Sequence, residues 1–212
     1  MKLAVQCDFD GTITREDVSF LILDEFAGDW RPLMADYMAG KMPVGTFNRM
    51  AFNRIKAGLP TLVDFTLNNE RIEVRPGFKE MLAYCREKGH RFVITSNGVD
   101  FYVEALLKDM GLADVEFYAA VSQMDPAGMK VQYIAPDGRE LEAGFKEAYT
   151  DMLINEGYDV VYIGNGISDI FPARKAVKVF ATADLVTRCE ETGLAYTPFD
   201  DFHDVMRGLE GL

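Results

Sequence analysis

Short apolar segments alternate with helix-like segments along most of the chain, and this alternation limits the fold more than any other feature of the sequence. Apolar runs of strand length are found at Leu3–Cys7, 91–95, 115–120, Val160–Ile163 and Val177–Phe180. Helical patterns are found between them, at 78–88, at 99–110, from about residue 146, after Asp169, and twice near the C-terminus. A hairpin is expected over 130–142, with its turn at Pro136-Asp137-Gly138. The sequence therefore predicts an α/β fold with a doubly wound parallel sheet, covered by helices on both faces.

One early segment departs from this alternation. From Asp17 to about Asn69, apolar residues recur at helical spacing and no strand-like run interrupts them. Breaks at Gly28-Asp29, 40–43 and 58–60 divide the segment into what should be four helices. We therefore expect a core of residues 1–14 and 74–212, with a small all-helical cap of residues 15–73 inserted after the first strand.

Charge and composition exclude several classes of protein. The 212 residues include 34 acidic and 22 basic ones, which gives a net charge of −12. Such a field repels nucleic-acid phosphates and anionic lipid, so neither nucleic acid nor a membrane is an expected partner. No apolar run approaches the roughly 20 residues of a membrane span, and the N-terminal residues lack a signal-peptide pattern. Three widely spaced cysteines outside any CxxC motif indicate reduced thiols and a cytoplasmic protein.

A pair of aspartates follows the first predicted strand directly. In doubly wound sheets, the loops at the carboxyl ends of the strands line the ligand crevice. Asp8 and Asp10 lie there, and two carboxylates so close together at the mouth of a buried strand are costly unless they share a cation or a proton. Gly11 then lets backbone amides turn toward an anion. An Asp-Gly turn with a helix cap at Thr14 is the alternative, but it leaves Asp8 unexplained.

Three further clusters have both an ordinary and a functional interpretation. Ser96 and Asn97 follow the second strand, where a hydroxyl and amides can hold a phosphate oxygen, although a helix cap and turn has the same pattern. Lys146 stands at the start of a predicted helix, where a lysine is usually solvated. Asn165 and Asp169 lie in the loop after a strongly apolar strand, and a loop ending in a helix cap would also explain them.

Together the clusters resemble the four motifs of the haloacid dehalogenase (HAD) superfamily of phosphotransferases. The segment DFDGTIT from Asp8 is similar to the first motif, Ser96 to the second, Lys146 to the third, and GNGISD from Gly164 to the fourth. Their order, their strand-end positions and the helical insert agree with the family over the whole chain. The insert resembles the small helical cap of the phosphoserine phosphatase-like branch. The resemblance implies a HAD-like, Rossmann-type core.

Finer features resemble one family of this branch, the 2-hydroxy-3-keto-5-methylthiopentenyl-1-phosphate phosphatases of methionine salvage. The similar segments are WRPLMADYMAGKM, RPGF, SNGVDFYV and ADLVTRCEETGLAYTPFDDF. The cysteine-rich segment that some members carry before the third-motif lysine is absent, and GRELEAGFKEAY stands in its place. The implied substrate is a small phosphorylated metabolite, of methionine salvage or of phosphoserine-like metabolism, and the implied assembly is a monomer or a homodimer.

The resemblance also implies a role for each motif residue. Asp8 would be the nucleophile that forms an aspartyl-phosphate. Asp10 would protonate the leaving alcohol and then activate the water that hydrolyses the intermediate. The residues implied to bind the phosphoryl group are Gly11, Ser96, Asn97 and Lys146. The implied ligands of a Mg²⁺ ion are Asp8, Asp10, Asn165 and Asp169.

Asn165 departs from the family pattern, which usually has at this position an acid that binds the metal directly. An asparagine keeps an oxygen donor but removes one negative charge, so we expect weaker Mg²⁺ binding, with Asp169 keeping part of the charge. Deamidation at Asn165-Gly166 would restore an aspartate in some molecules. A phosphometabolite-binding pseudo-phosphatase and a metal-independent HAD chemistry such as dehalogenation remain as alternatives. An active phosphatase is favoured because the other motif residues are present.

The cap is expected to select the substrate, and a closed cap admits only small molecules. Six large side chains are expected to pack in the cap core rather than against the ligand: Phe20, Trp30, Tyr37, Phe47, Met50 and Phe52. Arg49 and Arg54 are candidates for a second anionic group of the substrate, although solvated helix faces are the simpler expectation.

Overall fold

The computed structural model describes residues 2–211, and these residues form one sheet of eight strands in the order β5-β4-β3-β2-β1-β6-β7-β8. The strands are β1 (Leu3–Cys7), β2 (Arg91–Val99), β3 (Glu116–Asp125), β4 (Gly128–Ile134), β5 (Glu140–Leu141), β6 (Asp159–Gly164), β7 (Lys178–Ala181) and β8 (Thr197–Pro198). Strand β1 lies at the centre, parallel to β2 on one side and to β6 on the other. Only β4 and β5 run antiparallel to their neighbours in this described sheet. The sheet is therefore mainly parallel, as predicted.

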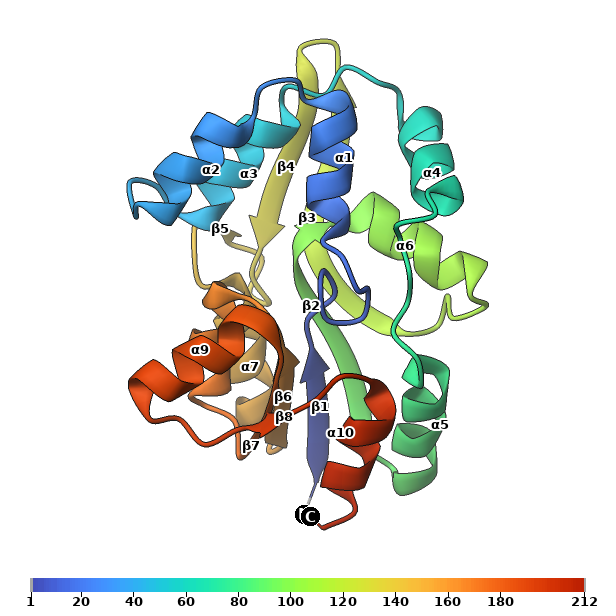
Figure 1. The fold of residues 1–212 in the computed structure, drawn as a ribbon, viewed down its shortest axis with the longest axis vertical. Helices are drawn as coiled ribbons and strands as arrows, with labels where there is room; N and C mark the ends of the chain where they lie inside the picture. Colours follow the sequence, from blue (N-terminus) through green and yellow to red (C-terminus); the bar gives the residue numbers. More distant parts are fainter. Residues whose placement is uncertain (1, 212) are drawn as a thin grey trace.

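Helices cover both faces of the sheet (Figure 1). Helices α5 (Phe78–Lys88), α6 (Asp100–Asp109) and α10 (Phe202–Leu209) lie on one side of it. Helices α7 (Phe145–Asn155) and α9 (Ala183–Thr192) lie on the other, together with the short α8 (Ile170–Ala173) that packs between them. The doubly wound α/β fold is thus confirmed.

Strand β1 is buried along its whole length because apolar layers pack on both of its faces. Leu3, Val5 and Cys7 belong to the main core, whereas Ala4 packs into a smaller cluster on the opposite face. Each large apolar side chain buried in this way stabilises the fold by about 1.5–3 kcal/mol. The loop that follows β1 is therefore held on a rigid base, and the site is built on that loop.

The four predicted helices after β1 are present and gather beyond the carboxyl end of the central strands (Figure 1). They are α1 (Val18–Phe26), α2 (Arg31–Met38), α3 (Val44–Phe52) and α4 (Leu59–Asn68). Asp17 caps α1 by accepting a hydrogen bond from the Phe20 amide. The chain leaves and re-enters the core along paired segments, since Thr14 and Val74 form an antiparallel bridge. A division into a separate cap of residues 15–73 and a core stays a prediction.

The structure differs from the predicted elements around β3 and after β6. Strand β3 continues past residue 120 to Asp125 because its second half pairs antiparallel with β4, in a hairpin that the sequence pattern did not reveal. The predicted β4–β5 hairpin is present. The helix expected after Asp169 is present but has only the single turn of α8, which follows a 3₁₀ turn, η1 (Ile167–Asp169).

The state of the cysteines and the length of the helices bear on two expectations drawn from the sequence. The three cysteines are buried and free. Within residues 2–211, none of the helices has both the length and the apolar character needed to cross a membrane.

Candidate active site

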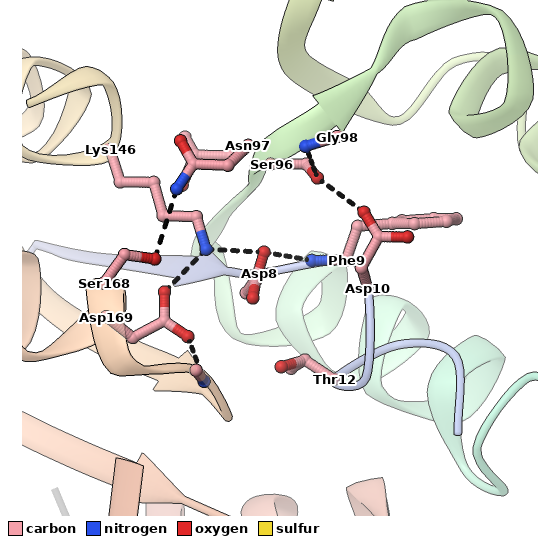
Figure 2. A network of polar contacts seen from close by, with 12 residues as sticks. Asp8, Phe9, Asp10, Thr12, Ser96, Asn97, Gly98, Lys146, Ser168 and Asp169 are labelled. Atoms are coloured by element: carbon pink, nitrogen blue, oxygen red, sulfur yellow. Dashed lines mark hydrogen bonds and ion pairs between the residues drawn. The ribbon is translucent and has the colours of Figure 1, made fainter. Parts of the chain in front are cut away.

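A cavity of about 260 Å³ lies between the carboxyl ends of the central strands and the cap helices α1–α3. Its floor carries the motif residues Asp8, Asp10, Ser96, Asn97, Lys146 and Asn165. Three separate strand-to-helix connections thus converge on one point, as the doubly wound topology requires. Figure 2 shows the Lys146 ammonium between Asp8 and Asp169, with Ser96 beside Asp10.

Lys146 is the central cation of the site. Its side chain is only 4% exposed, and its Nζ lies 2.7 Å from Asp8 Oδ1 and 2.6 Å from Asp169 Oδ1 (Figure 2). Helix α7 brings Lys146 to this position, and buried Gln6 of β1 holds the start of that helix by donating from Nε2 to the Lys146 carbonyl. The lysine is therefore a buried ion-pair partner rather than a solvated residue.

Lys146, Asp8 and Asp169 form a buried triad of one positive and two negative side chains, and the two carboxylates differ in their pKa shifts. Burial alone would lower the pKa of Lys146, but the charges of Asp169 and Asp8 outweigh it and raise that pKa above its ordinary value. Burial opposes ionisation of Asp169 too, yet Lys146 and further hydrogen bonds hold its pKa below the usual range. Asp8 has the opposite shift, because burial and the negative charge of Asp169 raise its pKa well above the usual range although Lys146 opposes them. One lysine is thus shared by two buried carboxylates, and positive charge is lacking at Asp8.

Asp169 has no free oxygen in this arrangement. Its Oδ1 accepts hydrogen bonds from Lys146 and from the Tyr162 hydroxyl, at 2.6 Å each. Its Oδ2 accepts from the backbone amides of Asn165 and Gly166, at 3.0 and 2.8 Å. Asp169 therefore holds both the lysine and the loop that carries Asn165.

Asp10 is held by three donors. Its Oδ1 accepts from the Val18 amide at 3.0 Å. Its Oδ2 accepts from the Tyr102 hydroxyl at 2.6 Å and from the Ser96 hydroxyl at 3.1 Å. Burial raises the pKa of Asp10 above its ordinary value, although the hydrogen bond from Tyr102 works in the opposite direction.

The last residues of β2, where the pairing with β3 is irregular between Thr95 and Val99, contribute Ser96 and Asn97. The Ser96 hydroxyl also accepts from the Gly98 amide at 2.8 Å, which orients it at the cavity floor. The Asn97 side chain donates to the Ser168 hydroxyl at 3.2 Å, while its Oδ1 is buried without a partner. This amide group is therefore held on one side only, between two of the strand-end loops.

Gly11 and Asn165 pack against each other. Gly11 has a φ of +72°, and a Cβ at this position would come within 2.2 Å of the Asn165 Nδ2, so conformation and space both require glycine. Its amide donates to the Thr14 hydroxyl and the Glu16 carbonyl, at 3.3 Å each, and Gly11 is not among the residues that line the cavity. Asn165 Oδ1 accepts from the Thr12 hydroxyl at 2.9 Å. The phosphate contact of Gly11 stays a prediction.

A Mg²⁺ ion at Asp8 would need neutral oxygen ligands in addition to the carboxylate. The described residues 2–211 contain no group of three or more His, Cys, Asp or Glu side chains placed to hold a metal. Asp8, Asp10 and Asn165 line the same cavity, and a carboxylate, a backbone carbonyl and an amide oxygen are all donor types that Mg²⁺ accepts alongside water. The excess of negative charge around Asp8 is consistent with a cation there.

The helices α1–α3 contribute mainly apolar side chains to the cavity wall, beside the polar Asp17, Ser19 and Asn48. Phe20, Tyr37 and Phe47 line it, together with Met34, Met38 and Val44. Trp30 and Phe52 lie in the core as expected, being 2% and 0% exposed. The expected burial of Met50 is wrong, because it is 46% exposed on the outer face of α3.

Arg49 and Arg54, the two candidates for binding a second anionic group, do not line the cavity. Arg49 pairs with Glu142 at 2.7 Å on the surface, and Arg54 is exposed. Among the lining residues within 2–211, Lys146 is the only basic one.

Sequence reasoning missed several residues that support the site. Tyr102 and Ser19 form a hydrogen-bonded chain to Asp10. Asn48 of α3 donates to the Asn97 carbonyl at 2.8 Å, and Tyr133 of β4 donates to the same oxygen. Each of these lies far along the chain from its partner and has the spacing of an ordinary helix or strand residue, so no local pattern distinguished it.

Comparison with known proteins places the chain among characterised sequences. A family model described as haloacid dehalogenase-like hydrolase matches residues 5–173. A 2-hydroxy-3-keto-5-methylthiopentenyl-1-phosphate phosphatase of Brevibacillus brevis is 33% identical over 216 residues, covering 99% of this chain and 96% of that protein. A protein of the same name from Geobacillus thermodenitrificans is 32% identical, covering 100% of this chain and 97% of its own length.

Solved structures of phosphoserine phosphatase share the fold. Its substrate-bound complex superposes with a TM-score of 0.72 at 18% identity, and each chain covers 97% of the other. A phospho-aspartyl intermediate analogue of phosphoserine phosphatase gives a TM-score of 0.71, also at 18% identity and 97% coverage of both chains. At this identity the likeness concerns the fold alone.

Proposed function

Because the chain belongs to the haloacid dehalogenase-like hydrolases, we propose that it hydrolyses a small phosphate monoester through an aspartyl-phosphate formed on Asp8. Membership of this superfamily and the phosphatase class, both predicted from the four motifs, are confirmed by the family match over residues 5–173 and by the full-length relatives. The assignment of the individual residues below is our proposal.

The observation that carries the proposal is the position of the Asp8 carboxylate. It stands at the end of a rigid central strand, faces the cavity and lies 2.7 Å from the Lys146 ammonium. A carboxylate so placed can approach a phosphorus atom whose oxygens are drawn to the same lysine, which reduces the repulsion between two anions. Ser96 and the Asn97 amide face the same space and supply further donors for the phosphoryl oxygens.

The proposed reaction has two steps. First an Asp8 oxygen attacks phosphorus, the bond from phosphorus to the ester oxygen breaks, and the departing oxygen takes a proton from Asp10. Asp10 then removes a proton from a water molecule, which attacks the phosphorus of the aspartyl-phosphate and releases inorganic phosphate. Asp8 and Asp10 return to their starting forms. Asp169 takes no direct part and holds Lys146 and the Asn165 loop.

We further propose that Mg²⁺ is held by Asp8, the Asp10 carbonyl and Asn165. When bound, the ion would supply the positive charge that Asp8 lacks and would neutralise the phosphoryl oxygens. Asp169 contributes to this site through its hydrogen bonds to the Asn165 and Gly166 amides, because both of its oxygens are already occupied.

The cap wall supports a substrate with an apolar tail. Phe20, Met34, Tyr37 and Phe47 face the space where the part of the substrate remote from phosphate would lie. A methylthio group, such as the relatives' name contains, fits this wall. The carboxylate of phosphoserine would find no cation there, because Lys146 is committed to the phosphoryl end. We therefore propose a methylthio-substituted keto-sugar phosphate of methionine salvage as the substrate.

Phosphate release from a panel of esters tests the proposal. The panel contains 2-hydroxy-3-keto-5-methylthiopentenyl-1-phosphate, phosphoserine and p-nitrophenyl phosphate, each with Mg²⁺ and with EDTA. We expect Mg²⁺-dependent release with a preference for the first ester, and its loss in Asp8→Asn. Asp151→Asn is the matched control, because in the described part of the chain Asp151 forms an ion pair only with Lys175, on the surface.

Other outcomes identify the alternatives. Binding of an ester without release would indicate a pseudo-phosphatase, and turnover that resists EDTA would indicate a different chemistry. Release that persists in Asp8→Asn would contradict the assigned nucleophile. A preference for phosphoserine would contradict the substrate class but leave the mechanism standing.

A further inference from the structure

Tyr102 makes a contact with Asp10 that the proposed reaction does not yet use. It lies in the first turns of α6, is fully buried, and its hydroxyl is 2.6 Å from Asp10 Oδ2. The Ser19 hydroxyl, from cap helix α1, lies 2.8 Å from the same phenol oxygen. A tyrosine has a single hydroxyl proton, and a carboxyl oxygen can accept it whether or not the group carries its own proton, so the Tyr102 proton goes to Asp10 and Ser19 donates to Tyr102.

Gly98 makes this contact possible. A Cβ at Gly98 would lie 1.6 Å from the Tyr102 hydroxyl oxygen and 2.3 Å from Asp10 Oδ2. The φ of Gly98 is outside the left-handed region, so its backbone conformation does not by itself require glycine. The glycine that follows Ser96 and Asn97 is therefore explained by the space that Tyr102 and Asp10 occupy.

The contact has a consequence for how Asp10 can act. An acid that protonates a leaving group must be held within hydrogen-bond reach of it. Oδ1 of Asp10 is fixed by the Val18 amide, and Oδ2 is shared by Tyr102 and Ser96. Ser96 is also assigned to the phosphoryl group, whereas the Tyr102 hydroxyl, among residues 2–211, has polar contacts only with Asp10 and Ser19.

We propose that Tyr102 is a positioning residue that holds the Asp10 carboxyl group in place for proton transfer to the leaving group. This inference rests on the proposed function, because it assumes that Asp10 is the acid. Loss of the phenol hydroxyl should then lower kcat/KM only for those esters whose leaving group needs a proton. An alkoxide is a poor leaving group without protonation, whereas p-nitrophenolate departs as a stable anion.

The test compares benzyl phosphate with p-nitrophenyl phosphate, two esters with one aromatic ring each, at saturating Mg²⁺. The measured quantity is kcat/KM, which includes every step up to departure of the alcohol and excludes hydrolysis of the aspartyl-phosphate. In Tyr102→Phe we expect a loss of about 10- to 100-fold for benzyl phosphate, part of the 10²- to 10⁴-fold that general acid catalysis contributes. For p-nitrophenyl phosphate we expect a change below about threefold.

Two further variants keep the result interpretable. Tyr149→Phe is the matched control, because Tyr149 is also buried and its hydroxyl donates to the Ile134 carbonyl at 2.9 Å. It should leave both kcat/KM values unchanged. Ser19→Ala removes the donor to Tyr102 and should reproduce the same selectivity for benzyl phosphate with a smaller loss. Because Ser19 also lines the cavity, a general effect of this change would appear equally for both esters, and the variant is decisive if Tyr102→Phe does not fold.

The outcomes separate this inference from the proposed function. An equal loss for both esters, or no loss for either, in a folded variant would overturn the positioning role while wild-type activity upholds the phosphatase. If the wild-type protein hydrolyses neither ester, nor any member of the panel, the proposed function and this inference both fail.

Discussion

Replacement of Lys146 by methionine should destabilise the protein strongly. The side chain is 4% exposed and its ammonium lies between Asp8 and Asp169, which are 7% and 0% exposed. Methionine fills a similar volume but leaves two buried carboxylates facing each other without a cation. Removal of one partner from a buried ion pair costs about 3–5 kcal/mol.

A second estimate from the geometry agrees in size. Both carboxylates lie within hydrogen-bond distance of the same nitrogen, so without it they remain close neighbours. Two like charges about 5 Å apart, at an effective dielectric constant of about 20, repel by about 3 kcal/mol. We therefore expect Lys146→Met to lower the free energy of unfolding by about 3–5 kcal/mol at neutral pH. Addition of Asp169→Asn should restore about 2–3 kcal/mol, since it removes one of the two charges.

Urea denaturation in EDTA measures these differences without interference from metal. Unfolding is followed both by the fluorescence of Trp30 in the cap and by far-ultraviolet circular dichroism, because coincident transitions are needed for a two-state treatment. Lys175→Met is the matched control. Lys175 lies 2.7 Å from Asp151, but the two side chains are 36% and 54% exposed, so the expected loss is below about 1 kcal/mol.

The reasoning would be refuted by a small effect at the buried site. If Lys146→Met costs no more than Lys175→Met, the buried triad does not depend on its cation. If Asp169→Asn restores nothing in the double variant, repulsion between the two carboxylates is not the cause of the loss.

Three further predictions concern the metal, the Gly98 contact and acid stability. Asn165→Asp should lower the Mg²⁺ concentration for half-maximal activity about tenfold or more by restoring a negative charge, and an unchanged Mg²⁺ titration would falsify this. Gly98→Ala should reduce kcat by at least about 100-fold, because its Cβ would overlap Tyr102 and Asp10; activity within threefold of wild type would contradict the close packing. The hydrogen bonds from Arg91 hold the pKa of Glu116 in the folded protein below its usual value. The ionised Glu116 therefore stabilises the fold fully above its pKa in the unfolded chain, about 4.3, and this contribution is lost as the pH falls through the lower pKa of the folded protein. Glu116→Gln should therefore cost about 1 kcal/mol at pH 7, and its difference from wild type in urea denaturation should shrink below about pH 4; a difference that grows on acidification would show the wrong sign.

The parts of the fold that the sequence predicted are those with strong local patterns. Strand β1 is a continuous apolar run that ends at Asp8, and the four cap helices have turn residues between them. The second half of β3 has no such pattern, because its burial alternates weakly and its pairing partner β4 supplies the order. Long-range pairing of this kind is decided by the tertiary structure and is invisible in a short window of sequence.

The same distinction applies to the site. Asp8, Ser96 and Asn165 stand at strand ends, and parallel strands bring their carboxyl ends together, so their convergence follows from topology. Tyr102 and Asn48 reach the site from helices whose apolar spacing is ordinary. Their roles depend on which atoms they meet, and only the three-dimensional structure specifies that.

The contrast between net and local charge follows from the same geometry. A chain with a net charge of −12 should repel a phosphate ester, yet the cavity floor places its one lysine against the nucleophile. Around that lysine stand Asp8, Asp10 and Asp169, so a bound dianion would add to a site already short of positive charge. A divalent cation at Asp8 would reduce this excess, whereas a second basic side chain in the cavity would compete with Lys146 for the same carboxylates. We therefore expect metal binding to favour binding of an anionic substrate at this acidic floor, so that measured substrate affinity depends on Mg²⁺.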